Sequence, residues 1–205
     1  MNVFVLCTGR NGSVTFIKAC KHSSNFSAGH ESRSKIIGKE AFNYTKDHIE
    51  ADNRLSWQLG KLDKAYGDNA FYVHLKRDRD KTAKSFFRRF NYRGSIVKSF
   101  CEGIKITPPE LLNEEEKLNV CYDYIDVVSD NIEHFLADKS RKMTMNIENI
   151  DEDFKYFWNQ IGANGDLELA LKEFSVQHNS SSQIKTSLKY NLKLFLYRVY
   201  RKFQK

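Results

Sequence analysis

The sequence predicts an α/β protein: a three-layer domain whose central, mainly parallel sheet is flanked by helices. The first observation is an apolar run over residues 3–7 that meets a glycine-bearing turn and then a helical pattern. The second is the β-rich run over residues 71–75, which is typical of a buried strand. The third is a long helical pattern between these strands and a later predicted strand over residues 142–147. Strands that alternate with helices favour a parallel sheet.

The elements follow one another in this order along the chain. A first strand is expected over residues 2–7, then a helix over 13–22, a short strand over 25–29 and a helix over 54–66. A turn over 66–69 precedes the strand at 71–75 and a basic helix over 80–92. A helix over 110–137 has apolar residues on one face, and the last expected elements are a strand over 142–147 and helices over 151–161 and 167–174.

Length and composition place the chain among globular proteins. With 205 residues, 40% of them hydrophobic, it fits a single domain over 1–205 and is not disordered. No run is apolar over the eighteen or so residues of a membrane span. Cys7, Cys20 and Cys121 fall on apolar faces without metal-ligand spacing, so they are expected to be small core residues rather than zinc ligands.

The positive charge comes from the end of the chain. The formal net charge is +7, and residues 174–205 contain no acidic residue. Residues 186–205 form a basic amphipathic pattern, which either docks on its own domain or lies on an anionic membrane surface. No stacking motif or helix-turn-helix pattern supports nucleic-acid binding, so none is expected.

The first candidate site is the turn after the first strand. Its backbone amides and the N-terminus of the following helix would favour a phosphate or sulfate group. It differs from a kinase-type phosphate loop because Gly9 and Gly12 are only three residues apart and no lysine precedes Ser13. An arginine, Arg10, lies inside the turn instead, so the sequence predicts an anion site that needs no metal.

The second candidate site follows the strand at 71–75. Arg77 falls at the strand exit, and Ser85 and Arg89 lie four residues apart on one face of the next helix. Arginine can hold an oxyanion through two parallel hydrogen bonds, so this group predicts a second anion site. A solvated basic helix face is the alternative.

Together, these segments resemble the sulfotransferases that use 3′-phosphoadenosine-5′-phosphosulfate (PAPS), especially their carbohydrate and tyrosylprotein branches. The turn at 8–15 resembles their 5′-phosphosulfate loop, although Asn11 and Val14 depart from the usual residues. The segment 77–85 resembles their 3′-phosphate motif, and Arg89 matches a further arginine of the tyrosylprotein branch. The run at 29–33 resembles the segment that holds that branch's catalytic glutamate. The resemblance covers roughly residues 2–165.

The resemblance implies the P-loop-like sulfotransferase fold and a role for each matching residue. Glu31 is the expected general base, with His30 as its rival, while Arg10 stabilises the leaving phosphate. Arg33 is a candidate contact for an anionic acceptor, with a surface role as the alternative. Asp52 or Asn53 is expected first to cap a helix and only second to contact the acceptor. The residues expected to bind PAPS are Arg10, Asn11, Gly12, Ser13, Val14, Thr15, Arg77, Ser85 and Arg89.

The expected activity is transfer of a sulfuryl group from PAPS to an acceptor hydroxyl of a carbohydrate or glycolipid, without a metal. A small P-loop-like nucleotide kinase and a non-catalytic anion- or membrane-binding protein are the alternatives. The expected location is the cytoplasm, with membrane association if residues 186–205 bind lipid. Trp57, at helical spacing with Leu55 and Leu59, is expected in the core.

Overall fold

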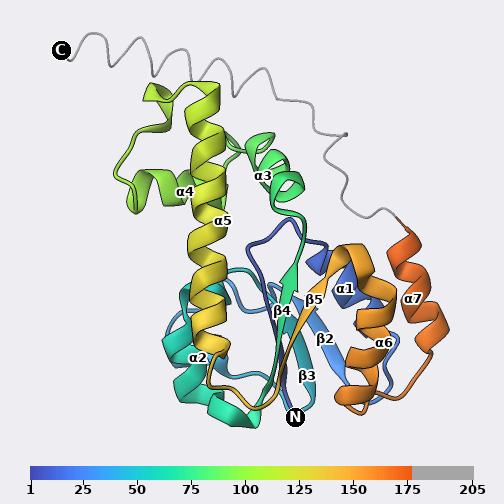
Figure 1. Ribbon diagram of the computed structural model, residues 1–205. Coiled ribbons are helices and arrows are strands. Elements are labelled where there is room, and N and C mark those ends of the chain that lie inside the picture. Colours follow the sequence, from blue (N-terminus) through green and yellow to red (C-terminus); the bar gives the residue numbers. More distant parts are fainter. Residues whose placement is uncertain (177–205) are drawn as a thin grey trace.

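The computed structural model describes residues 1–176 and shows a parallel sheet between two layers of helices, as predicted (Figure 1). The five strands lie in the order β2-β3-β1-β4-β5, and each pairs in parallel with its neighbours. They are β1 (Val3–Leu6), β2 (Ser27–His30), β3 (His48–Ala51), β4 (Phe71–Lys76) and β5 (Lys142–Asn146). Because all strands are parallel, their carboxyl ends meet at one edge of the sheet.

Helices cover both faces of the sheet. One face carries α1 (Ser13–Cys20), α6 (Ile150–Gln160) and α7 (Leu167–Ser175), and the other carries α2 (Leu59–Tyr66), α3 (Arg79–Phe87) and α5 (Glu114–Leu136) (Figure 1). The helix α4 (Ile96–Gly103) packs against α5. Short 3₁₀ turns lie at Gly38–Phe42, Leu55–Trp57, Gly67–Asn69, Pro109–Leu111 and Ile147–Asn149. This arrangement confirms the predicted fold class.

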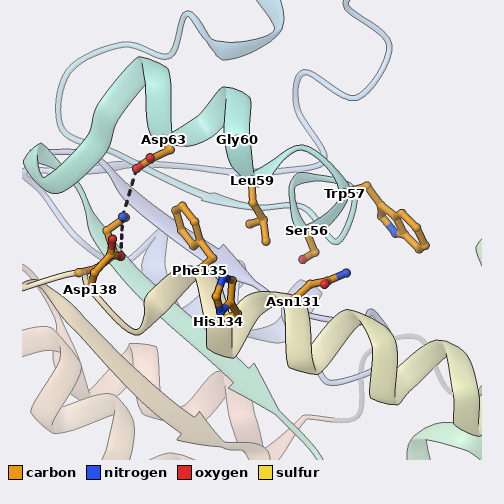
Figure 2. A pocket seen from close by; sticks show the side chains of 10 residues that line it. Ser56, Trp57, Leu59, Gly60, Asp63, Asn131, His134, Phe135 and Asp138 are labelled. Carbon is orange, nitrogen blue, oxygen red and sulfur yellow. Dashed lines mark hydrogen bonds and ion pairs between the residues drawn. The ribbon is translucent and has the colours of Figure 1, made fainter.

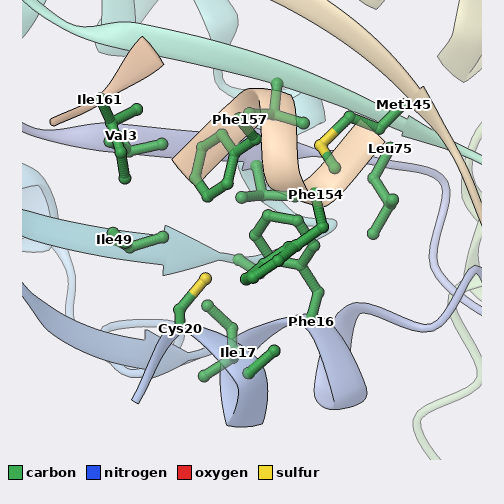
Figure 3. Packing of buried hydrophobic residues seen from close by; sticks show 14 of the residues in the cluster. Val3, Phe16, Ile17, Cys20, Ile49, Leu75, Met145, Phe154, Phe157 and Ile161 are labelled. Atoms are coloured by element: carbon green, nitrogen blue, oxygen red, sulfur yellow. The ribbon is translucent and has the colours of Figure 1, made fainter. Parts of the chain in front are cut away.

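Each face of the sheet has its own hydrophobic core. Along β1, Val3 and Val5 point to the α1 side while Phe4 and Leu6 point to the α5 side, as strand alternation requires. On the α1 side, the ring of Phe16 lies 5.4 Å from that of Phe154 and 5.2 Å from that of Phe157 (Figure 3). These contacts fix α1, and with it the turn that precedes it, against the sheet. The predicted core role of Cys7, Cys20 and Cys121 is confirmed, since all are buried and outside any disulfide.

The long helix α5 begins later than predicted. Asn113 caps it in a capping box with Glu116, after the short turn at Pro109–Leu111. Its predicted apolar stripe is buried at Cys121, Ile125, Val128 and Ile132. The helix therefore packs on the sheet face opposite α1, where it contacts β4.

Within residues 1–176, one strand and one α-helix were not predicted from the sequence. The strand β3 was missed because Glu50 interrupts its apolar pattern, although this side chain is fully buried. The helix α4 was missed although it has an N-cap at Ser95 and apolar residues at Val97, Phe100 and Cys101. The predicted helix over 54–66 is shorter, since a 3₁₀ turn at Leu55–Trp57 precedes α2.

The described part of the chain ends before the predicted C-terminal helix. Residues 186–205 and the membrane contact expected of them lie outside the described residues. Within residues 1–176, none of the helices has the length and apolar character needed to cross a bilayer.

Candidate functional site

The residues of both predicted anion sites lie at the carboxyl edge of the sheet. The turn after β1 contains Arg10, β4 is followed by Arg77, and α3 contains Ser85. Nε of Arg10 donates to the hydroxyl of Ser85 over 3.1 Å. NH1 of Arg77 donates to the carbonyl oxygen of Arg10 over 3.0 Å. The two predicted sites are therefore parts of one site.

The turn after β1 has an unusual backbone. Gly9, Arg10 and Gly12 all have left-handed φ angles, of 89°, 65° and 83°. A residue with a side chain at such an angle costs of order 1–3 kcal/mol, so Arg10 must be held by its surroundings. The hydrogen bonds that Arg10 makes with Arg77 and Ser85 hold it in this conformation.

We expect Gly12→Ala to damage this turn. A methyl group there would lie 2.8 Å from Cδ1 of Ile147 at a φ angle that alanine rarely adopts. The free energy of unfolding should fall by about 1–3 kcal/mol in urea denaturation. Gly60→Ala is the matched control, because a methyl group at Gly60 meets nothing within 4 Å and alanine favours the helix α2. Equal stabilities of the two variants would contradict this account.

Positive charges gather around Arg10. Burial lowers the pKa of Arg10 to about 10, and repulsion from Arg89, Arg77 and Arg88 adds to this effect. Nε of Arg89 is buried and makes no hydrogen bond within residues 1–176. A group with several negative charges would relieve the repulsion and take the donors that remain. Arg88 was not selected from the sequence, where it reads as one more charge of a basic helix.

The other residues of the turn have separate roles. Asn11 is buried, and its Nδ2 donates to the carbonyl oxygen of Leu75 over 2.7 Å. This side chain ties the turn to β4, so its amide N–H group is already bound within the protein. Ser13, Val14 and Thr15 form the first turn of α1 and are half-buried. The hydroxyl of Ser13 is hydrogen-bonded to Nε2 of His30 over 3.0 Å.

A group of acidic side chains lies across the sheet edge from the arginines. Glu31 follows β2, and its Oε2 lies 2.9 Å from NH1 of Arg54. Asp52 follows β3, is only 3% exposed, and accepts a hydrogen bond from the backbone N–H of Arg54 over 2.8 Å. Burial raises the pKa of Asp52, and the nearby charges of Glu31 and Glu50 act in the same direction. Sequence analysis missed Arg54, which binds both candidate carboxylates.

Arg33 and Asp52 lie in surroundings that the sequence did not indicate. Nε of Arg33 donates to the carbonyl oxygen of Glu40 over 2.8 Å, and its guanidinium lies over the ring of Tyr44. Arg33 is thus engaged with the segment after β2 rather than with Glu31. The carboxylate of Asp52 binds the backbone N–H of Arg54, which precedes the 3₁₀ turn at Leu55–Trp57. Neither this turn nor α2 has a side-chain cap, so the N-cap interpretation of Asp52 or Asn53 is wrong.

A groove of about 470 Å³ runs between α2 and α5 (Figure 2). Asn131 and His134 of α5 face Ser56 and Leu59 across it. Trp57, expected in the core, is 38% exposed and lines the groove, because the 3₁₀ turn directs it outward. Its ring stacks on Tyr124, whose hydroxyl donates to the carbonyl of Thr8 at the start of the turn after β1.

A smaller cavity of about 260 Å³ lies behind that turn, between β4 and α5. His74 lines it and is 2% exposed, and burial, assisted by Lys76, lowers the pKa of His74 from 6.5 to about 4. Between about pH 6.5 and pH 4 the unfolded chain therefore binds a proton that the folded protein does not. Between pH 7 and pH 4.5, this proton binding should lower the wild type's free energy of unfolding by about 2–3 kcal/mol. In His74→Leu the loss over the same pH range should be smaller by that amount. Urea denaturation at both pH values tests this, and equal losses in the two proteins would contradict it.

Comparisons with known proteins support the fold. No protein-family model matches this chain, and no curated protein matches it either. Among solved structures, it is similar to mouse sulfotransferase SULT7A1 complexed with PAP, with a TM-score of 0.58 and 10% identity, over 91% of this chain and 68% of that chain. The chain therefore has a sulfotransferase-like fold. Among residues 1–176 there is no group of three His, Cys, Asp or Glu residues placed to hold a metal ion.

Proposed function

We propose that this protein is a sulfotransferase that moves the sulfuryl group of PAPS to an acceptor hydroxyl. The contact that carries the proposal is the hydrogen bond between Arg10 and Ser85, which joins the turn after β1 to the helix after β4. PAPS has a phosphosulfate at one end and a separate 3′-phosphate, so its binding needs two adjoining anion sites. The similar fold of mouse SULT7A1, which was crystallised with PAP, supports the same choice.

In this proposal the donor lies along the arginine cluster. The backbone of the turn at 8–13, the start of α1 and Arg10 bind the 5′-phosphosulfate. Ser13 and Thr15 offer hydroxyl groups from the first turn of α1. Arg77, Ser85 and Arg89 bind the 3′-phosphate and so distinguish PAPS from ATP. The number of positive charges makes a metal ion unnecessary for charge balance.

The chemical step is an in-line displacement at sulfur, governed by positioning and charge stabilisation like phosphoryl transfer. The acceptor oxygen forms a bond to sulfur while the bond from sulfur to the 5′-phosphate oxygen breaks. Glu31 takes the proton of the acceptor hydroxyl, and Arg10 stabilises the charge that develops on the leaving phosphate. The products are a sulfate ester and adenosine 3′,5′-bisphosphate (PAP).

We propose a carbohydrate or glycolipid hydroxyl as the acceptor. The resemblance to the carbohydrate branch of the family supports this class. The groove of Figure 2 suits it, since Trp57 offers an apolar ring face while Ser56, Asn131 and His134 offer hydrogen-bonding groups. Trp57 links the groove to the turn at 8–13, since its ring stacks on Tyr124 and the hydroxyl of Tyr124 donates to the carbonyl of Thr8.

Calorimetric titration without metal tests the donor site. PAP should bind at least about tenfold more tightly than ADP or AMP, because only PAP has the 3′-phosphate that Arg77 and Arg89 would hold. Binding of ADP only with magnesium would favour the nucleotide kinase. Equal binding of all three nucleotides without metal would contradict the sulfotransferase.

A further inference from the structure

A fully buried carboxylate lies beneath the turn that follows β2. Glu50, on β3, is 0% exposed, and burial of an unpaired carboxylate is strongly unfavourable. It accepts hydrogen bonds from the backbone N–H and the hydroxyl of Ser32, over 2.7 and 2.5 Å. Nε2 of His48 lies 3.0 Å from it, and Nδ1 of His48 is hydrogen-bonded to the hydroxyl of Ser27 over 2.8 Å. The buried charge is thus bound to β2 and to the turn after it.

Gly29 provides the space for this network. In the parallel pairing of β2 with β3, Gly29 lies opposite Glu50. A methyl group at Gly29 would lie 2.7 Å from Oε2 of Glu50 and 3.1 Å from Nε2 of His48. Any larger residue would therefore push the carboxylate away from its donors.

The turn that Glu50 binds contains Glu31. The φ angle of Glu31 is 51°, a left-handed conformation that costs of order 1–3 kcal/mol for a residue with a side chain. Its own N–H donates to the carbonyl of Ala51 over 3.0 Å, and the next N–H, of Ser32, donates to Glu50. The end of β3 therefore binds the peptide groups on both sides of Glu31.

We propose that Glu50 and His48 are positioning residues that hold Glu31 in this left-handed turn, with its carboxylate toward Arg54 and the acceptor. The catalytic part of this inference rests on the proposed function, in which Glu31 takes the acceptor's proton. The network also explains why a charged residue occupies an interior strand. Its charge fixes a turn that would otherwise relax to a less strained backbone.

Amide hydrogen exchange, measured by NMR on the full chain, tests whether the network holds the turn. In Glu50→Gln, the amides of Glu31 and Ser32 should exchange at least about tenfold faster than in the wild type, while the amide of Val73 in β4 is unchanged. Glu40→Gln is the matched control, since this exposed carboxylate lies in the same connection and does not bind the turn. Unchanged exchange at Glu31 would overturn the proposal.

A second pair of variants covers the case in which Glu50→Gln loses protection throughout the protein. Ser32→Ala removes only the hydroxyl that binds Glu50, and Ser32→Thr keeps it. Exchange at Glu31 should be faster in Ser32→Ala and close to that of the wild type in Ser32→Thr. Identical exchange in both variants would overturn the proposal.

Donor turnover separates a positioning role from a merely structural one. In the absence of acceptor, water attacks the sulfur of PAPS, its proton passes to Glu31, and the products are sulfate and PAP. Glu50→Gln should lower kcat for this hydrolysis by about tenfold to a hundredfold, with KM for PAPS nearly unchanged. An unchanged kcat would overturn the positioning role. A wild type that fails to bind PAP would refute the proposed function, while the exchange data would still decide whether Glu50 holds the turn.

Discussion

Arg77→Ala is expected to weaken the binding of PAP by about a hundredfold, which corresponds to roughly 3 kcal/mol. Arg77 has two functions in the proposed site. Its guanidinium binds the carbonyl of Arg10 and so supports the left-handed turn. In the proposal, its other donors bind the 3′-phosphate. The substitution removes a charged contact to the ligand and loosens the turn that binds the other end of the donor.

Calorimetry with PAP and AMP separates these two functions. Loss of the 3′-phosphate contact weakens PAP alone, whereas a loosened turn weakens AMP as well. Arg77→Lys keeps the charge but not the fork of donors, so it should bind PAP with intermediate affinity. Arg141→Ala is the matched control, because Arg141 precedes β5 at the opposite edge of the sheet. If Arg77→Ala binds PAP as the wild type does, the 3′-phosphate lies elsewhere.

The segments of the candidate anion site could be placed from the sequence because their signals are local. An apolar run followed by a glycine-bearing turn marks a strand, a loop and a helix, and an arginine after a buried run marks a strand end. The rule that the carboxyl ends of parallel strands share an edge then brings the two segments together. It does not say which side chains meet, so the contact between Arg10 and Ser85 and the approach of Arg88 required the structure.

The acceptor side was harder to predict because it depends on contacts between distant residues. No strand was predicted over 48–52, since Glu50 and Asp52 interrupt the apolar pattern, and Arg54 was placed at the start of a helix. Glu50 is compatible with a buried strand only because Ser32 and His48 supply donors to it. Without β3, neither the support of the turn at Glu31 nor its partner Arg54 can be inferred from sequence. Trp57 was wrongly expected in the core because the 3₁₀ turn at Leu55–Trp57 was not predicted.

Glu31→Gln is expected to lower kcat for sulfuryl transfer by about 10²–10⁴-fold, the range that a positioned general base supplies. The amide keeps the shape of the side chain but cannot accept the acceptor's proton. Because Glu31 binds Arg54 rather than the arginines of the donor site, PAP affinity should change little. A matched control is Glu168→Gln, an exposed carboxylate in the first turn of α7, which should leave kcat unchanged.

The rival base gives a different pattern. His30 is hydrogen-bonded to Ser13 in the first turn of α1, so His30→Gln should disturb the phosphosulfate site and raise KM for PAPS more than it lowers kcat. Full activity of Glu31→Gln, together with a large loss of kcat in His30→Gln, would assign the proton transfer to His30. In that case Glu31 and Asp52 have only a structural role. Arg54 would then neutralise the buried carboxylate of Asp52 and would not orient a base. If only Glu31→Gln loses kcat, Glu31 is the base, in the turn that the end of β3 binds.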